Sequence, residues 1–410
     1  MTKTELAELI RNGEHSGVEF KRDDVHPDSL AKEIAALANL EGGYLLLGVE
    51  DDGTVCGITR RPKEVEGWVM NVCRTNIQPA FIPYFESIRW DKSRRVAVVT
   101  IPADSPDKPY KAREGRHWVT FVRVGSTSRV ATREEEQRLY QASGILRYDI
   151  KPVPGSTLKD LDLHRLANYF ADIRGQDHPS LDDKEGWFHL LVNTEIMVED
   201  RGQAIPTVGG MLLFGSRPNK FLPQAGISAT AYPGLEKEYS TIEEEVIRGS
   251  LVSLFSKQKR VSESGVIDRA VEFVRRNMGV RAWIEGGRRH QQHSYPLEAV
   301  REVIVNAVAH RDYTITGTDV EISLYKNRLE IISPGRLPNT VTVEKMKQGY
   351  RVSRNELIKE VLRDYGYIEH RGMGIPYKVI RGMREHNGTE PDLIEEESRF
   401  IVRLWKDKPK

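Results

Sequence analysis

Three carboxylates near the amino terminus have a spacing that could bring them together. Glu14 and Glu19 flank a turn, and Asp51 follows the apolar run 44–49. If 18–21 is a strand that pairs with this run, the three side chains meet at one edge of a sheet. Carboxylate oxygens bind Mg²⁺ or Mn²⁺, which activates water and stabilises a transferring phosphoryl group. On spacing alone, a set of solvated loop charges is the simpler interpretation.

Cations accompany these acids. Lys21 alternates with Glu19 and so shares its face of the expected strand, where it could contact a scissile phosphate. A second group of cations, with aromatic residues interleaved, occurs between residues 108 and 129. Cations bind phosphates and aromatic faces stack on bases, so we expect nucleic-acid contacts from Lys111, Arg113, Arg116 and Arg123. A solvated hairpin above core aromatic residues explains the same pattern.

A further candidate site lies in the apolar stretch 296–309. Glu298, Glu302 and Asn306 recur every four residues, so they share one face if the stretch is a helix. An asparagine in the middle of an apolar helix is poorly explained by helix propensity. Its carbonyl oxygen could hold a metal ion, while Glu302 orients or deprotonates a water molecule. The alternative is a polar stripe on the surface of a packed helix.

A mixed framework of helices and strands must position these residues. The chain has 410 residues, of which 39% are hydrophobic and 30% charged, which is typical of folded domains. Hydrophobic periodicity predicts helices at 4–11, 28–40, 132–140, 158–191, 243–255, 266–276 and 296–309. It predicts strands at 18–21, 44–49, 95–101, 118–124, 206–215 and 225–232, with a hairpin turn at Asp52-Gly53.

Composition and breaker residues give the domain organisation. The segment 151–157 contains two prolines and a glycine and reads as a linker, and a second boundary falls near 286–292. We therefore expect a multidomain α/β (α+β) protein with domains at 1–150, 151–290 and 291–410. The net charge of +1 excludes a histone-like protein but not a local basic groove. Two cysteines, no signal pattern and no long apolar run favour a cytoplasmic protein without membrane contact.

Four motifs stand together in the first 140 residues. They are Gly13-Glu14-x-x-x-Val18-Glu19-Phe20-Lys21, Ile34-Ala35-Ala36-Leu37-Ala38-Asn39-Leu40-Glu41-Gly42-Gly43, Leu47-Gly48-Val49-Glu50-Asp51-Asp52-Gly53-x-Val55-x-Gly57 and Phe121-Val122-Arg123-Val124-Gly125-Ser126. This combination closely resembles the Schlafen/Alba-like domain. The resemblance implies a mixed-sheet domain associated with nucleic acid. In members with nuclease activity, two glutamates and an aspartate form the metal site, and these match Glu14, Glu19 and Asp51, with Lys21 beside them. Other members are described as DNA-binding or regulatory domains.

A second set of motifs begins at Glu302. It comprises Glu302-x-x-x-Asn306-Ala307-x-x-His310-Arg311-Asp312-Tyr313, Arg328-Leu329-Glu330-Ile331-x-Ser333-Pro334-Gly335-x-Leu337-Pro338, Arg354-Asn355 and Ile368-Glu369-x-x-Gly372-x-Gly374-Ile375. These motifs resemble a GHKL-type ATPase module, which implies an α/β sandwich that binds ATP or a related nucleotide. By this resemblance Glu302 is the general base, Asn306 binds magnesium, and Gly372 and Gly374 bind phosphates through backbone N–H groups. The middle segment resembles an α/β connector of the same architecture.

Two departures qualify this second resemblance. The family's usual Asp-x-Gly-x-Gly box is replaced by Ser333-Pro334-Gly335-Arg336-Leu337-Pro338, so no aspartate is placed to accept the adenine amino group. The chain also contains no P-loop motif, so helicase activity is not supported.

Together these features lead to three hypotheses. The first is a nucleotide-gated, metal-dependent nuclease that acts on RNA or DNA as a homo-oligomer, with weak ATP hydrolysis at most. The family resemblance adds a role in anti-phage defence. The second hypothesis is a nucleic-acid-binding transcriptional regulator that binds ATP but does not cleave. The third is an assembly scaffold in which both sites are vestigial.

Overall fold

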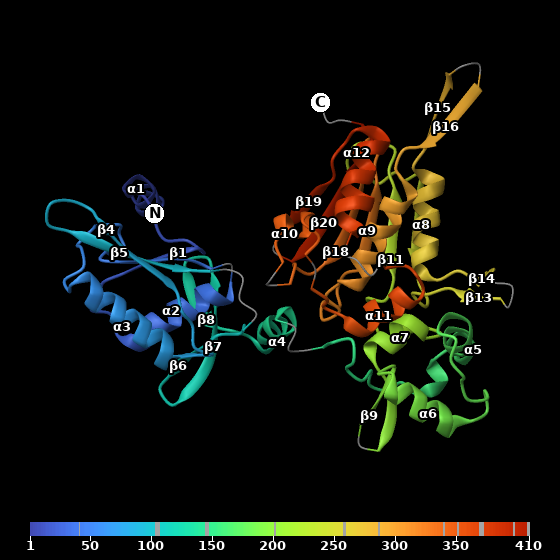
Figure 1. Cartoon of the computed structure of the whole chain (residues 1–410), viewed down its shortest axis with the longest axis horizontal. Helices are drawn as coiled ribbons and strands as arrows, with labels where there is room; N and C mark the ends of the chain where they lie inside the picture. Colours follow the sequence, from blue (N-terminus) through green and yellow to red (C-terminus); the bar gives the residue numbers. More distant parts are fainter. Residues whose placement is uncertain are drawn as a thin grey trace. The chain divides into compact units, whose positions relative to one another are not determined.

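A computed structural model shows two compact units, Met1–Leu146 and Arg147–Lys410 (Figure 1). Each unit is described by itself below. Both combine helices with sheets, which confirms the expected multidomain α+β class. The structure describes residues 1–40, 42–102, 107–143, 147–200, 202–256, 260–285, 288–338, 341–350, 352–368, 373–396 and 398–407.

The first unit is built on a four-stranded sheet with the order β1-β2-β5-β4. Its strands are β1 (Val18–Lys21), β2 (Gly43–Leu47), β5 (Arg95–Ile101) and β4 (Tyr84–Arg89). β1 and β2 are parallel, with Lys21 opposite Leu47, and the other pairs are antiparallel. The expected pairing of 18–21 with the apolar run is therefore confirmed.

Alternation of side chains along this sheet creates two cores. Leu45 and Leu47 face α2 (Pro27–Asn39) and α3 (Pro62–Thr75), whereas Leu46 packs on the opposite side with Leu6 of α1 (Lys3–Asn12). A second sheet, with the order β3-β6-β7-β8, lies on the far side of α2. It contains β3 (Ile77–Gln78), β6 (Lys111–Glu114), β7 (His117–Val124) and β8 (Thr127–Val130), and α4 (Arg133–Ala142) follows. The small residues of α2 let it fit between the two sheets.

One buried amide joins α2 to the second sheet. The Asn39 Nδ2 group donates hydrogen bonds to the carbonyls of Tyr110 and Phe121, both at 2.8 Å. Its Oδ1 accepts from the backbone N–H of Tyr110 at 2.7 Å. Because Asn39 is buried, no water molecule could take the place of its side chain as the hydrogen-bond partner of these three backbone groups. Its place in the sequence motif therefore has a structural explanation.

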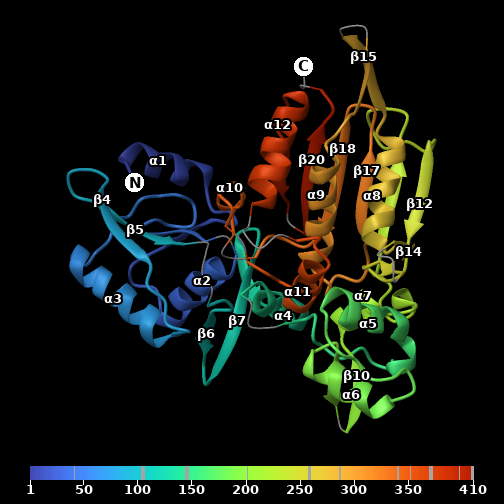
Figure 2. The same cartoon turned by 45° about the vertical axis from the view of Figure 1, so that its right-hand side comes forward.

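The second unit is built on a six-stranded sheet with the order β12-β11-β17-β18-β20-β19. The strands are β11 (Ile227–Ala231), β12 (Glu243–Ile247), β17 (Val320–Leu324), β18 (Arg328–Pro334), β19 (Asp392–Glu395) and β20 (Arg399–Trp405). β11 and β17 are parallel, and the other pairs are antiparallel. Three helical segments pack along one face, namely α8 (Val266–Asn277), α9 (Leu297–Ala309) and the π-helical η4 (Gly374–Arg381) continued by α12 (Gly382–Asn387) (Figure 2).

Shorter elements complete this unit. A helical part contains η1 (Leu158–Asp160), α5 (Leu163–Asn168), η2 (Tyr169–Ile173), α6 (Lys184–Asn193), α7 (Val208–Phe214) and η3 (Pro218–Lys220). Two-stranded ribbons are β9 (Met197–Asp200) with β10 (Gln203–Pro206), β13 (Leu254–Phe255) with β14 (Val261–Glu263), and β15 (Val280–Glu285) with β16 (Arg288–His293). α10 (Val343–Lys347) and α11 (Glu356–Asp364) precede η4.

Two expected elements of this unit were wrong in type. Residues 206–215 were expected as a strand but form helix α7, which begins after Thr207, whose Oγ1 accepts from the Gly210 N–H. A Cβ at Gly210 would lie 2.1 Å from the Ile196 carbonyl oxygen, so this glycine permits a close helix approach. Residues 243–255 were expected as a helix but form β12 and β13. In apolar runs and short acidic segments, hydrophobic periodicity alone does not distinguish a helix from a strand.

The observed division between residues 146 and 147 lies close to the expected boundary at residue 150, whereas the expected linker and the expected boundary near residue 290 lie inside the second unit. The segment 151–157 is packed into the second unit, where the Val153 N–H donates to the carbonyl of Pro206 and the Val153 side chain is buried. The expected boundary near residue 290 lies inside this unit. The pairing of β11 with β17 and one shared core connect the segments on either side of it.

No helix in the described ranges is both long enough and apolar enough to cross a lipid bilayer.

Asn39→Ala should weaken the attachment of α2 to the second sheet. The substitution leaves three buried backbone groups without partners, each worth about 1–3 kcal/mol, so we expect a loss of about 3 kcal/mol or more. Hydrogen exchange followed by mass spectrometry should show faster exchange in β6 and β7. Asn71→Ala, at an exposed helical position, is the control. Unchanged exchange in β6 and β7 would contradict the proposed role of Asn39.

Candidate functional site

The three amino-terminal carboxylates gather around the ammonium group of Lys21. Lys21 Nζ lies 2.5 Å from Glu19 Oε1, 3.9 Å from Asp51 Oδ1 and 4.0 Å from Glu14 Oε1. The parallel pairing of β1 with β2 causes this arrangement, because Asp51 follows β2 at the edge where β1 ends. Glu19 is buried at the bottom of the cluster and Asp51 is the most exposed of the three acids.

Arg123 fixes the innermost acid. Its Nη1 group lies 2.7 Å from Glu19 Oε2 and 3.2 Å from Glu33 Oε2. Its Nη2 group donates to the backbone carbonyls of His15 and Val18. These two hydrogen bonds stabilise the turn that leads into β1. The Arg123 side chain is fully buried, so we correct its expected nucleic-acid contact: it positions Glu19 from inside the fold.

The electrostatics of the cluster favour a positive charge at its centre. Burial raises the pKa of Glu14, and the negative charges of Glu19 and Asp51 raise it further. The hydrogen bond from the Phe20 N–H and the positive charge of Lys21 lower this pKa, but the net change is upward. Burial opposes ionisation of Lys21, but its hydrogen bond to Glu19 and the neighbouring carboxylates leave its pKa above the ordinary value. The acids thus repel one another, and the ammonium offsets that repulsion.

The cluster does not form a set of metal ligands in this arrangement. Among the residues the structure describes, no group of three or more His, Cys, Asp or Glu side chains is arranged to hold a metal ion. The donor chemistry of three carboxylates suits Mg²⁺ or Mn²⁺. A metal ion would therefore have to take the place of the Lys21 ammonium group.

The expected nucleic-acid contacts differ in their availability. Arg113 and Arg116 are exposed at the turn between β6 and β7. Lys111 is partly buried, and its ammonium lies 2.9 Å from Glu136 Oε1. Arg113 and Arg116 are therefore the members of this set that project into solvent.

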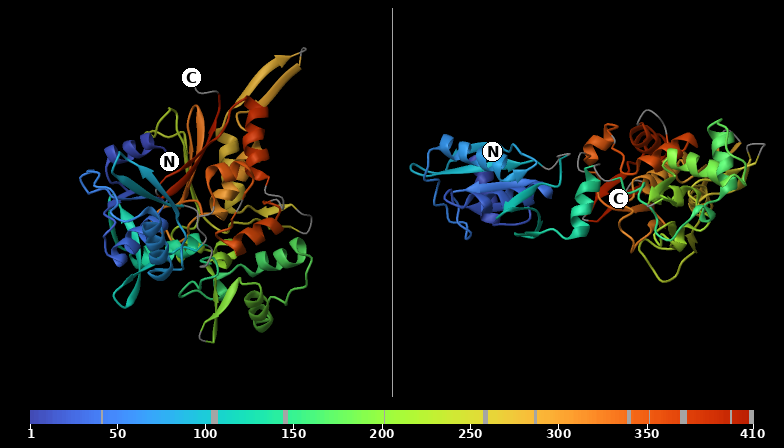
Figure 3. Two further views of the ribbon diagram at one scale, coloured as in Figure 1. Left: turned by 60° about the vertical axis from the view of Figure 1, so that its left-hand side comes forward. Right: turned by 90° about the horizontal axis from the view of Figure 1, so that it is seen from below.

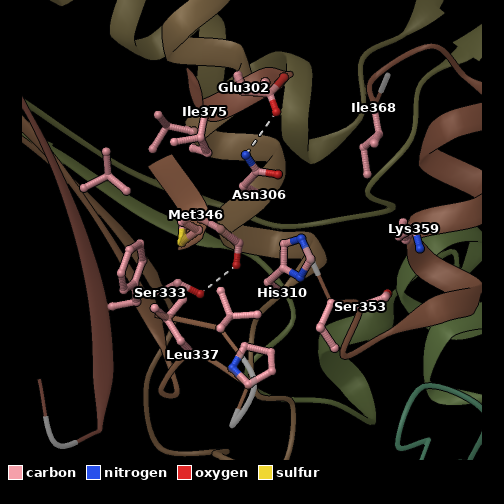
Figure 4. A pocket seen from close by; sticks show the side chains of 18 of the residues that line it. Glu302, Asn306, His310, Ser333, Leu337, Met346, Ser353, Lys359, Ile368 and Ile375 are labelled. Carbon is pink, nitrogen blue, oxygen red and sulfur yellow. Dashed lines mark hydrogen bonds between the residues drawn. The ribbon is translucent and has the colours of Figure 1, made fainter. Parts of the chain in front are cut away.

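The second candidate site is a pocket of about 370 Å³ between α9, β18, α11 and the start of η4 (Figure 4). Glu302, Asn306 and Gly374 all line it, and Gly372 lies outside the described residues. Asn306 Nδ2 donates to Glu302 Oε1 at 3.1 Å, as expected for side chains one turn apart. A Cβ at Gly374 would lie 1.8 Å from Glu302 Oε1, so the absence of a side chain lets the carboxylate approach the backbone.

The remaining lining combines apolar and cationic side chains. Arg336, Lys359 and Arg363 line the pocket with the single acid Glu302 among its described residues. The Ser333 hydroxyl donates to the Ala307 carbonyl at 2.7 Å, which leaves its oxygen able to accept a further hydrogen bond. Burial and the charge of Arg354 lower the pKa of His310 to about 4, so its ring is neutral at pH 7. This lining suits a small anionic ligand with an apolar part.

The motif after Asn306 has a structural role at the end of α9. Asn355 Nδ2 donates to the carbonyls of Ala309 and Arg311, and Arg354 Nη1 donates to that of His310. Arg311 donates to three carbonyls of the following loop, those of Asp312, Ile315 and Thr318. The carbonyls at a helix carboxyl end lack partners within the helix, and these side chains supply them.

Sequence reasoning missed two residues that the geometry brings to the sites. Glu33 shares Arg123 with Glu19 and also accepts from Ser128. Lys378, on η4, has its ammonium 3.8 Å from Glu302 Oε2. Neither residue belongs to a recognisable motif, and each reaches its site only through the packing of a distant element. Their residue types alone gave no signal.

Comparison with known proteins yields matches to two protein families and to several solved structures. Among curated proteins, no sequence matches the chain. The DIP2311 protein from Corynebacterium diphtheriae is 19% identical, with 99% of this chain and 80% of that chain covered and a TM-score of 0.44. The N-terminal domain of a protein from Nitrosomonas europaea described as "Putative ATP-dependent DNA Helicase RecG-related Protein" is 25% identical, with 32% of this chain and 94% of that chain covered and a TM-score of 0.26.

The family matches correspond to the two expected modules. Residues 14–132 match the family described as "Schlafen, AlbA_2" and include Glu14, Glu19 and Asp51. Residues 317–404 match HATPase_c_4, described as "Putative ATP-dependent DNA helicase recG C-terminal". The second match begins after Asn306, so Glu302 and Asn306 lie outside it. An amino-terminal segment of the chain thus matches the Schlafen/AlbA_2 family, and a carboxy-terminal segment matches HATPase_c_4.

Proposed function

We propose that this protein is a divalent-cation-dependent nuclease whose activity responds to a nucleotide. The observation that carries the proposal is the convergence of Glu14, Glu19 and Asp51 on the Lys21 ammonium at one sheet edge. The two family matches support a function related to nucleic acid. The role in anti-phage defence, which the resemblance implied, and the expected homo-oligomer stay predictions.

The chain's own residues have distinct parts in this proposal. A bound Mg²⁺ or Mn²⁺ ion would supply activation of water and stabilisation of negative charge on the phosphoryl group. Glu19, clamped by Arg123, provides a fixed ligand, while the exposed Asp51 can adjust. The displaced Lys21 ammonium would then lie next to the scissile phosphate as a point charge. Arg113 and Arg116 would hold the flanking phosphates.

The carboxy-terminal pocket is proposed to bind ATP or a related nucleotide. Its volume of about 370 Å³ lies in the range of small-molecule sites, and its cations suit phosphates. In this proposal Glu302 would orient a water molecule, and Asn306, whose amide donates to Glu302, would bind a magnesium ion through its carbonyl oxygen. The Ser333 oxygen offers an acceptor near the position where the usual aspartate is missing.

A second candidate function is that of a non-cleaving, nucleic-acid-binding regulator. The observation that favours it is the Lys21 ammonium itself, which already neutralises the carboxylates without a metal ion. The two candidates differ in their response to divalent cations, and the next experiments separate them.

Glu19→Gln should abolish cleavage without unfolding the protein. It removes the innermost charge but keeps the shape of the side chain, and we expect a loss of about 100-fold or more in rate. Purified protein is incubated with tRNA, single-stranded RNA, and single- and double-stranded DNA, with Mg²⁺, Mn²⁺ or EDTA. Glu66→Gln, an exposed acid of the same unit, is the matched control. Equal cleavage by wild type and Glu19→Gln would remove the proposed active site, and metal-independent binding without cleavage would favour the regulator.

Lys21→Met should strengthen cation binding while it reduces cleavage. The incoming ion no longer has to displace an ammonium group that is partly buried among three acids. Loss of that competition is worth about 1 kcal/mol, or several-fold in affinity. Titration calorimetry with Mn²⁺ measures the effect, with Lys63→Met on the exposed side of α3 as the control. Weaker Mn²⁺ binding in Lys21→Met would show that the two cations do not share one position.

Gly374→Ala should reduce nucleotide hydrolysis and binding by moving Glu302. The new Cβ cannot coexist with the Glu302 carboxylate in its present position, so the carboxylate must leave Asn306. Asn306→Ala should abolish Mg²⁺-dependent binding outright. Titration with labelled ATP tests both variants. Gly317→Ala is the control, since a Cβ there meets open space. Unchanged ATP affinity in Asn306→Ala would defeat the assignment of this pocket.

A further inference from the structure

The ribbon β15–β16 extends beyond the helices and sheet of the second unit (Figures 1 and 3). Its two strands pair in an unbroken register, from Val280 opposite His293 to Glu285 opposite Arg288. Six residues in each strand give a length of about 20 Å. The ribbon is therefore long enough to reach a partner that does not touch the rest of the unit.

The root of the ribbon is fastened to α12. The His386 ring bonds to the His293 carbonyl through Nε2, at 2.7 Å, and to Gln292 Nε2 through Nδ1, at 3.0 Å. The Ser294 N–H donates to the Gly279 carbonyl, which closes the base of the two strands. These bonds fix the direction in which the ribbon leaves the unit.

Two apolar side chains of β15 are open to solvent, Val280 at the root of the ribbon and Ile284 near its other end. Ile284 is 78% exposed and Val280 is 53% exposed. Two-stranded ribbons are only marginally stable by themselves in water, so a long solvated one has little structural benefit. Its length and exposure are better explained by a partner that covers it.

The composition of the ribbon indicates the charge of that partner. The sequence of the two strands contains three arginines and one acid, together with a histidine and two glutamines: Arg281, Glu285, Arg288, Arg289, His290, Gln291 and Gln292. Arginine and glutamine are the side chains that most often read base edges, and arginine also binds phosphates. None of these residues has a part in the two proposed sites.

We propose that the β15–β16 ribbon binds duplex DNA by entering its major groove. The major groove of B-form DNA accepts a two-stranded β-ribbon, and basic, amide-bearing ribbons are one established way of reading it. The major groove of an RNA duplex is too narrow and deep for this. The ribbon belongs to the second unit and does not depend on whether the amino-terminal cluster cleaves.

A second copy of the chain is the competing partner, but its charges fit less well. The acidic surface that would attract the ribbon is the segment 243–245 on edge strand β12. Glu243 is already paired with Arg276 at 2.5 Å, and Glu245 with Arg269 at 2.7 Å. Glu243 and Glu245 are paired within their own unit, which leaves the exposed Glu244 of this segment, whereas DNA offers a continuous row of phosphates.

The test is DNA binding by the full chain with Arg288→Glu and Arg289→Glu combined. Fluorescence anisotropy with a labelled 20-base-pair DNA duplex is measured in EDTA, so that metal-dependent cleavage does not interfere. Loss of two phosphate or base contacts should weaken binding roughly tenfold or more and reduce the slope of log K against log salt by about 2. Lys159→Glu with Arg217→Glu, both exposed in the same unit, makes the same charge change and should alter affinity less than about twofold.

A crosslink gives a readout that does not depend on these charges. A photoreactive amino acid at position 284, in the otherwise unchanged chain, should crosslink to the DNA duplex. Unchanged affinity and salt slope in the double variant would overturn the proposal. So would crosslinking at position 284 to a second copy of the chain or to an RNA duplex instead of DNA. Arg288→Gln with Arg289→Gln should also weaken DNA binding, by a smaller factor. This neutral variant keeps the test valid if the charge-reversed variant misfolds.

Discussion

The first unit depends on the balance of charge around one ammonium group. Three carboxylates approach Lys21 because two parallel strands end at the same sheet edge, and like charges so close require a cation. Arg123 supplies a second positive charge from the interior of the fold, and hydrogen bonds to backbone carbonyls fix its position. The cost of burying these groups separately would be high, so the fold keeps them paired. The cluster is thus held together by two cationic side chains, Lys21 and Arg123.

The second unit depends on side chains that satisfy the backbone carbonyls at the buried carboxyl end of a helix. α9 carries Glu302 and Asn306 and must remain rigid beside the pocket. Asn355, Arg354 and Arg311 satisfy the carbonyls at and beyond its carboxyl end. At the other side of the pocket, Gly374 lets η4 begin directly against the Glu302 carboxylate. The pocket is thus shaped by backbone hydrogen bonds more than by the groups expected to contact a ligand.

The sequence was sufficient to predict the elements that depend on a local pattern of residues. The strands 18–21 and 95–101, the Asn306 helix and the convergence of the acids followed from alternation, helical spacing and strand pairing. The secondary structure of residues 206–215 and 243–255 did not follow from these patterns, because tertiary contacts decide between helix and strand there. The burial of Arg123 was also hidden, because an arginine in a basic stretch looks like a ligand contact until its partners are placed. Glu33 and Lys378 come from elements remote in the sequence, and only packing brings them to the sites.

The parallel pairing of β11 with β17 has a practical consequence for protein production. Almost ninety residues, including both strands of the basic ribbon and the Asn306 helix, lie between these neighbouring strands. A fragment that stops near residue 290 would leave β11 with an open hydrogen-bonding edge above an incomplete core. Such edges recruit strands from other molecules and cause aggregation. Expression of the carboxy-terminal half should therefore begin at residue 147 and keep the chain through β20.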